Sequence, residues 1–167
     1  MNLVRAQTPK IRNGEKEVEP KEITIRLATP ADADRITELC IQLGYSVSSE
    51  MVKRRLQKLS EKIDTAAFVA EINSFIAGWI QVSIRETIES GESPEIAGLL
   101  VDEAARDKGI GRRLVKEAED WGAALGHQSV RVRTNIVRTA ARNFYHRLGF
   151  EETKQQIVFS KRLSSEP

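Results

Sequence analysis

A loop with two glycines and several cations follows an apolar stretch of the chain at residues 99–112. It has the sequence L-L-V-D-E-A-A-R-D-K-G-I-G-R, and the apolar periodicity of a long helix starts at its second glycine. Such a loop can point several backbone N–H groups at one position, where the helix N-terminus adds partial positive charge. Gly109 and Gly111 allow a ligand to approach the backbone closely. The segment therefore predicts a site for a phosphate or pyrophosphate group.

Two common types of phosphate-binding loop are excluded, because the chain lacks the sequence pattern that each requires. A Walker loop needs G-x-x-x-x-G-K-[ST], which the chain lacks. The dinucleotide fingerprint G-x-G-x-x-G needs a glycine at position 114, where Leu114 stands. The remaining pattern is R-x-x-G-x-G between a strand and a helix. By itself it is also compatible with a tight turn beside a basic surface cluster.

A second segment, from Thr134 to Phe150, narrows the range of protein families that the loop could belong to. It has the sequence T-N-I-V-R-T-A-A-R-N-F-Y-H-R-L-G-F. Together the two segments resemble the GNAT family of N-acetyltransferases, which carries a [QR]-x-x-G-x-[GA] loop and a later N-x-x-(…)-A-x-x-F-Y-x-x-L-G-F block. The matching residues are Arg106, Gly109, Gly111, Asn135, Ala141, Phe144, Tyr145, Leu148, Gly149 and Phe150. The resemblance covers about residues 22–163.

The resemblance implies a V-shaped opening between two parallel strands that holds acetyl-CoA as cosubstrate. The pantetheine would pair with backbone groups of Leu99, Leu100 and Val101. The pyrophosphate would lie on the loop formed by Arg106, Asp107, Lys108, Gly109, Ile110, Gly111 and Arg112. Asn135 would hydrogen-bond pantetheine, and Arg138 and Arg142 would reach a phosphate of CoA. His127 and His146 have no partner ligands at metal-binding spacing, so we expect no metal.

The resemblance also suggests two catalytic residues. Tyr145 occupies the position of the family's general acid, which protonates or stabilises the departing sulfur; the alternative is a core tyrosine beside Phe144. The carboxylate that many members use as base would fall at Ala97. Glu95, on the same face of an unbroken strand, is the expected substitute, although a solvated glutamate is equally compatible. Glu92 is the second candidate for the general base.

These assignments predict an N-acetyltransferase that transfers acetyl from acetyl-CoA to a primary amine by direct attack in a ternary complex. One alternative is a non-catalytic CoA-binding module of the same fold, since the carboxylate at 97 is missing. The other is an arginine-rich nucleic-acid binder, which the near-neutral charge disfavours. The acidic run at residues 86–95 favours a cationic small-molecule or peptide acceptor. The resemblance is also compatible with a homodimer.

The pattern of elements predicts an α/β fold with one mixed sheet flanked by helices. Alternation and helical spacing give a strand at 23–27, helices at 29–43 and 49–62, strands at 66–72 and 75–84, and an acidic loop at 86–94. A strand at 95–101, a helix at 111–125, a strand at 128–134, a helix at 139–147 and a strand at 155–163 follow. The strands at 95–101 and 128–134 should be parallel, because a helix connects them.

Composition limits the function further. The 167 residues are 40% hydrophobic and 30% charged, with a formal net charge of +2, as in ordinary globular domains. We expect residues 1–21 to be a disordered leader and 22–167 to form a single domain. Cys40 is the only cysteine, and the N-terminus lacks the apolar core of a secretory signal. The expected location is cytoplasmic, with no membrane partner.

Overall fold

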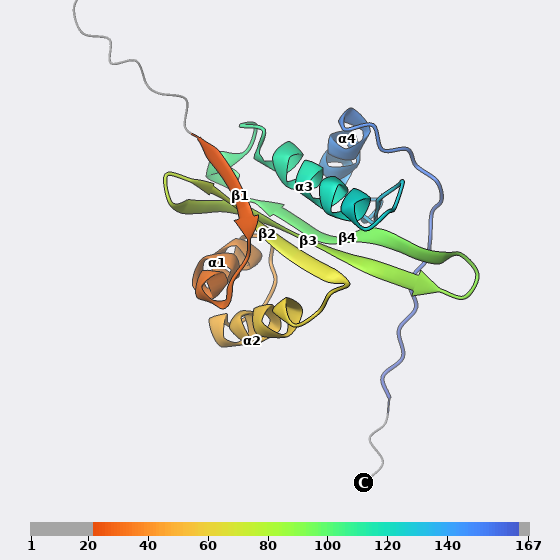
Figure 1. Ribbon diagram of the computed structural model, residues 1–167, viewed down its shortest axis with the longest axis horizontal. Helices are drawn as coiled ribbons and strands as arrows, with labels where there is room; N and C mark the ends of the chain where they lie inside the picture. The colour runs from red at the N-terminus through yellow and green to blue at the C-terminus, as the bar shows by residue number, and fades with distance from the viewer. Residues whose placement is uncertain (1–21, 164–167) are drawn as a thin grey trace, which may run out of the picture.

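The computed structural model describes residues 22–163, which form a mixed five-stranded sheet with helices on both faces (Figure 1). The elements are β1 (Ile23–Leu27), η1 (Pro30–Asp32), α1 (Ala33–Gln42), α2 (Ser49–Ser60), β2 (Thr65–Ile72), β3 (Phe75–Thr87), β4 (Gly91–Val101), η2 (Glu103–Ala105), α3 (Ile110–Ala124), β5 (Arg131–Val132) and α4 (Thr139–Arg147). The strand order is β1-β2-β3-β4-β5. Only β4 and β5 pair in parallel, as the helical connection predicts.

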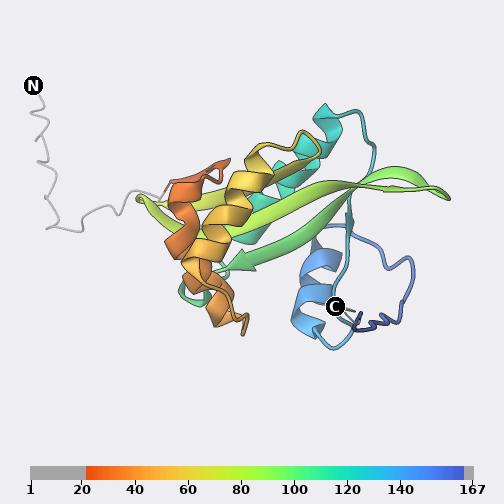
Figure 2. The same cartoon turned by 90° about the horizontal axis from the view of Figure 1, so that it is seen from below.

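Two apolar clusters hold the layers together. On one face, α3 contributes Ile110, Leu114 and Val115 to a buried cluster with strand residues such as Ile80. On the other face, α1 and α2 cover the sheet, and Leu39 of α1 is fully buried. Figure 2 shows α1 and α2 side by side across this second face, with α4 beyond β4. The helical spacing of apolar residues predicted both packed faces.

The start of α1 is fixed by a network that also joins β1 to β2. Thr29 precedes the turn η1, and its backbone amide and hydroxyl donate to Asp32 at 2.7 and 3.0 Å. Arg26 on β1 donates two hydrogen bonds of 2.8 Å to Asp32 and a third of 2.8 Å to Glu71 on β2. The bidentate pair orients the helix against the sheet edge.

Three sequence predictions about the strands need correction. Residues 86–94 are not a loop, because β3 runs to Thr87 and β4 starts at Gly91. Pro94 can lie in β4 because β5 pairs only from Glu95 onward, so no neighbour on that side needs its amide. The strand expected at 128–134 shortens to β5, and 155–163 contains no strand. The isolated apolar side chains of this last segment are more than 80% exposed.

No helix within residues 22–163 has the length and apolar character needed to cross a membrane. The predicted leader, residues 1–21, lies outside the described part of the chain.

Candidate active site

The predicted phosphate loop connects β4 to α3 and leaves a row of amides free. Asp107 and Gly109 have positive φ angles of 62° and 78°, and α3 starts at Ile110, one residue before the predicted start. Within residues 22–163, the amides of 107–112 donate to no backbone acceptor. The first amides of a helix cannot bond inside it, so they remain available to an anion.

The basic side chains of the loop differ in whether they already have a partner within the protein. Arg106 pairs with Glu103 at 3.2 Å, and Lys108 donates to the carbonyl of Ala104 at 2.9 Å, so both fold back over η2. Arg112 is exposed and has no acidic partner in the described chain. Of the three, Arg112 is the cation most accessible to a phosphate.

The entry to this loop is anchored by an ion pair that sequence reasoning missed. Asp102, at the end of β4, accepts from the amide of Ala104 at 3.0 Å and forms an ion pair with Arg35 of α1. The guanidinium of Arg35 also donates to the carbonyl of Ile76 on β3 at 3.1 Å. The contact therefore joins α1, β3 and the start of the phosphate loop. An aspartate directly after an apolar strand is the only signal of it in the sequence.

The parallel strands separate where the resemblance places the cosubstrate. Pairing between β4 and β5 is limited to Glu95 with Arg131 and Ile96 with Val132. From residue 97 to 101, β4 continues with no strand of the described chain on that side, and we call this stretch the unpaired β4 edge. It contains Leu99, Leu100 and Val101, so their backbone groups lie on the edge from which pantetheine pairing was predicted.

A bulge occurs at the start of the unpaired β4 edge. Gln81 of β3 pairs with Gly98 and the next residue, Val82, pairs with Ile96, so Ala97 is the extra residue. A Cβ at Gly98 would lie 2.9 Å from the ring of Trp79, which explains the glycine. The bulge interrupts the strict alternation of side chains. Leu99 and Val101 therefore pack with the α3 cluster, as Ile96 does, and Glu95 lies on the opposite face from them.

Tyr145 lies in α4 among aromatic side chains on the α3 face of the sheet. Its ring makes edge contacts with Phe144 and Phe150, with centroid distances of 5.2 and 5.4 Å. Burial raises the pKa of Tyr145 to about 12. The phenol is therefore neutral at ordinary pH and able to donate a hydrogen bond.

Gly111 contacts α4, which gives it a role beyond the predicted approach of phosphate. A Cβ at this position would lie 3.0 Å from the ring of Phe144. Gly111 therefore allows the first turn of α3 to pack against α4. This contact brings the loop and the helix that carries Tyr145 together.

Glu95 lies on the face opposite α3 and is surrounded by cations. Its neighbour Ile96 belongs to the α3 cluster, so Glu95 points to the other face. Its Oε2 lies 3.2 Å from Arg133 and 3.7 Å from Arg85. Glu95 and Tyr145 therefore lie on opposite faces of the sheet. The surroundings of Glu95 are basic, in contrast to the acidic side expected from residues 86–95.

The three other predicted cofactor contacts lie before and within α4. The Oδ1 of Asn135 accepts from the amide of Val137 at 3.1 Å, so its amide nitrogen and the second lone pair of Oδ1 remain free for a ligand. Arg138 is the residue before the first turn of α4. Arg142 is bound to Glu152 through Nε at 2.8 Å and a terminal nitrogen at 2.6 Å, and Glu152 also contacts His146 at 3.2 Å. A phosphate would have to compete with Glu152 for Arg142.

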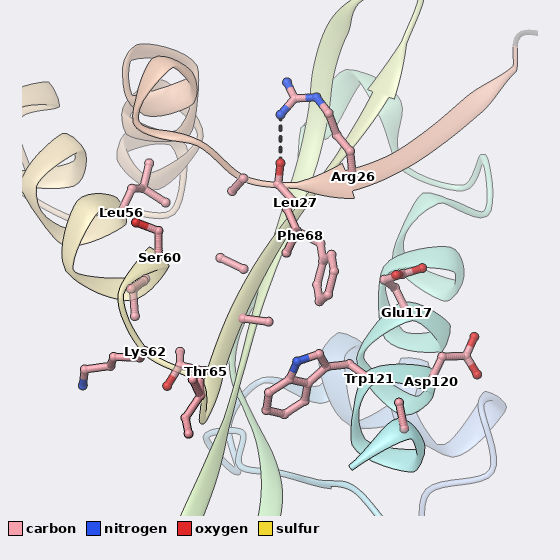
Figure 3. Close-up of a pocket in the computed structure, with 16 residues that line it drawn as sticks. Arg26, Leu27, Leu56, Ser60, Lys62, Thr65, Phe68, Glu117, Asp120 and Trp121 are labelled. Atoms are coloured by element: carbon pink, nitrogen blue, oxygen red, sulfur yellow. Dashed lines mark hydrogen bonds between the residues drawn. The ribbon is translucent and has the colours of Figure 1, made fainter.

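A hollow of about 660 Å³ lies elsewhere, away from these residues. Figure 3 shows it between α2, the end of β1 and α3, with Phe68 and Trp121 projecting into it from β2 and α3. Its lining is mainly apolar, and none of the predicted site residues contributes to it. The predicted residues instead lie around the unpaired β4 edge and the loop that follows it.

Comparison with known proteins identifies related chains. The model of the acetyltransferase (GNAT) family matches residues 34–150. An uncharacterized N-acetyltransferase of Chlorobaculum tepidum is 32% identical over 136 residues, which cover 81% of this chain and 78% of that protein. Another from Methanocaldococcus jannaschii is 29% identical over 140 residues, covering 79% of this chain but only 62% of the relative. The structure of the aminoglycoside N-acetyltransferase AAC(6')-Iy in complex with CoA is 22% identical, with a TM-score of 0.78 and coverage of 86% and 97%.

Proposed function

The chain belongs to the acetyltransferase (GNAT) family, and from this premise we propose that it transfers an acetyl group from acetyl-CoA to a primary amine of a small molecule or peptide. The observation that carries the proposal is the unpaired β4 edge followed by the row of free amides at 107–112. An extended pantetheine can pair with the edge, and a pyrophosphate can accept from the amides. The aminoglycoside acetyltransferase of similar fold was determined with CoA, which supports the choice of cosubstrate.

The residues suggest direct transfer in a ternary complex. The amine nitrogen attacks the thioester carbonyl carbon, the new C–N bond forms, and the C–S bond breaks. The phenol of Tyr145 supplies a hydrogen bond to the departing sulfur. A lysine-like amine has a pKa near 10.4, so it arrives as a cation and must lose a proton before attack. We propose Glu95 as the acceptor of that proton, directly or through water, with Glu92 as the reserve.

A second function is favoured by one observation. Alanine stands at 97, and the nearest carboxylate, Glu95, is engaged by Arg85 and Arg133. A chain without an effective base would bind CoA without turnover. This alternative predicts cosubstrate affinity with no acetyl transfer.

The deciding experiment measures CoA thiol release from acetyl-CoA in the presence of a panel of amines, alongside calorimetric titration with acetyl-CoA. We expect binding and amine-dependent thiol release. Binding without release for every amine would favour the binding module. The absence of binding would refute the assignment of the loop. Arg54→Gln on α2, an exposed position away from β4, serves as the matched control.

A further inference from the structure

A small basic hollow lies on the sheet face that carries Glu95, toward the turn end of the β3–β4 hairpin. Its volume is about 80 Å³, and its charged lining consists of Arg85, Arg131, Arg133, Lys154, Glu89 and Glu95. Four cations against two carboxylates leave an excess of positive charge. The C-terminal segment supplies Lys154 as it passes the hairpin, shown in blue beside the green strands in Figure 1.

Ion pairs among residues 22–163 do not neutralise the excess charge. Arg85 and Arg133 share one oxygen of Glu95. Within residues 22–163, Arg131 and Lys154 make no ion pair. The hydroxyls of Thr87 and Ser90 also line the hollow; they are hydrogen-bonded to each other at 2.6 Å, which leaves one of the two O–H groups to donate to a ligand. Guanidinium, ammonium and hydroxyl donors around one position are suited to a carboxylate or a phosphate.

The size of the hollow limits what can enter. A water molecule has a share of about 30 Å³ in the liquid, so the hollow holds two or three waters. That space accommodates one carboxylate or phosphate group and excludes a sugar ring. The occupant is therefore the anionic end of a larger molecule whose remainder lies outside.

The hollow is adjacent to the proposed reaction centre. Glu95 and Arg131 form one of the two paired positions of β4 and β5, and the unpaired β4 edge starts two residues later. Since a strand rises about 3.3 Å per residue, that distance is about 7 Å along the strand. We propose that the hollow binds an anionic group of the acceptor, so the acceptor is an amine that also carries a carboxylate or a phosphate. This inference rests on the proposed function, because it assigns part of the same active site.

The first test compares acceptors that differ only in the anionic group. Glucosamine 6-phosphate against glucosamine, and an amino acid against its carboxamide, are suitable pairs. We expect kcat/KM to be about tenfold higher for the anionic member, as for a hydrogen bond to a charged group, and the advantage to shrink with added salt. Arg131→Gln and Lys154→Gln should reduce the advantage by raising KM while kcat stays near the parent value. Equal kcat/KM values within both pairs, or an advantage that both variants retain, would overturn the inference.

The second test does not depend on turnover. Inorganic phosphate is titrated into the full chain by NMR, with Arg131→Gln as the variant and Arg54→Gln as the control. We expect saturable shifts around β5 that weaken about tenfold in Arg131→Gln and remain in Arg54→Gln. No saturable binding, or binding unaffected by Arg131→Gln, would contradict an anion subsite. Thiol release that shows no preference for anionic acceptors would refute the anion subsite but not the proposed function. If no amine causes thiol release, the proposed function itself is refuted.

Discussion

The environment of Tyr145 determines how it can assist the reaction. Burial raises its pKa to about 12, whereas a thiol has a pKa near 8.5. Complete proton transfer from the phenol to the departing thiolate is therefore uphill by roughly 3.5 units, or about 5 kcal/mol. A hydrogen bond from the neutral phenol to the sulfur avoids this cost. Tyr145 is therefore better suited to stabilise the leaving group than to protonate it fully.

Tyr145→Phe keeps the ring in its aromatic contacts and removes only this hydrogen bond. We expect kcat to fall by roughly 10- to 10³-fold with little change in affinity for acetyl-CoA. Steady-state kinetics and calorimetry measure the two quantities. Tyr45→Phe, at a position that is 54% exposed, is the control and should behave like the parent. Full activity in Tyr145→Phe would reduce Tyr145 to a packing residue.

Glu95 makes a separate prediction about pH. If its carboxylate accepts the amine proton, Glu95→Gln should lower kcat/KM at neutral pH by tenfold or more and flatten its rise with pH. The measurement is kcat/KM against pH for both proteins. Glu92→Gln, at an exposed position on the same strand, is the comparison. An unchanged profile in Glu95→Gln would exclude this residue as the base, and a flattened profile only in Glu92→Gln would transfer the role.

At the scale of elements, the junction of β1, η1 and α1 depends on one buried carboxylate. Asp32 is 8% exposed, and its hydrogen bonds from Arg26 hold its pKa below the usual range. Because folding lowers this pKa, Asp32 contributes stability above the unfolded-state pKa of about 3.9. That contribution is lost as the pH falls through the lower folded-state value.

Asp32→Asn should therefore destabilise the protein by about 1.5–3 kcal/mol at pH 7, the range for hydrogen bonds to a charged group. The difference from the parent should shrink as the pH falls below about 3.9, because the unfolded parent binds the proton first and the folded carboxylate binds it only at its lower pKa. Urea unfolding at pH 7 and pH 3 measures both values. Asp64→Asn, at an exposed position, should have little effect. A constant difference between the two pH values would show that charge is not the cause.

Gly111 has two proposed roles: it allows α3 to pack against α4, and it allows phosphate to approach the backbone. Gly111→Val places side-chain atoms against Phe144 and should cost about 1–3 kcal/mol of stability through overpacking. It should also weaken acetyl-CoA binding by tenfold or more, because the backbone is less accessible to phosphate. Adding Phe144→Leu should relieve the loss of stability but leave binding weak. Recovery of both in the double variant would show that Gly111 acts only through helix packing.

For the whole molecule, periodicity predicted the element order up to α4 because most elements bury one regular face. It failed at residues 86–94, where glutamate, glycine and proline suggest a loop, although the β3–β4 hairpin continues through them. It also failed at 155–163, where the β-branched and aromatic residues Ile157, Val158 and Phe159 are typical of a strand but find no partner within the described chain. Whether such a segment forms a strand depends on whether another strand pairs with it, and the residues of the segment alone do not determine that.

The site was predictable to the extent that its geometry is local. The loop before α3 and the limits of α4 follow from glycines and helical spacing. The side of the sheet on which Glu95 lies relative to Leu99 and Val101 does not, because the bulge at Ala97 depends on how β4 pairs with β3. The cations around Glu95 likewise come from β3, β5 and the C-terminal segment, and only the folded chain brings them together.

The start of the domain can be tested by truncation. β1 pairs with β2 from Ile23 onward, and Ile23 and Ile25 pack against the α3 cluster. We propose that the domain starts at residue 22, so a chain lacking residues 1–21 should keep its melting temperature within about 2 °C and its affinity for acetyl-CoA. Removal of 1–28 is the informative contrast, because it deletes β1 and the partner of Asp32, and it should lower the melting temperature by several degrees. A loss of acetyl-CoA affinity or kcat in the shorter truncation would place part of residues 1–21 in the active site and refute the boundary.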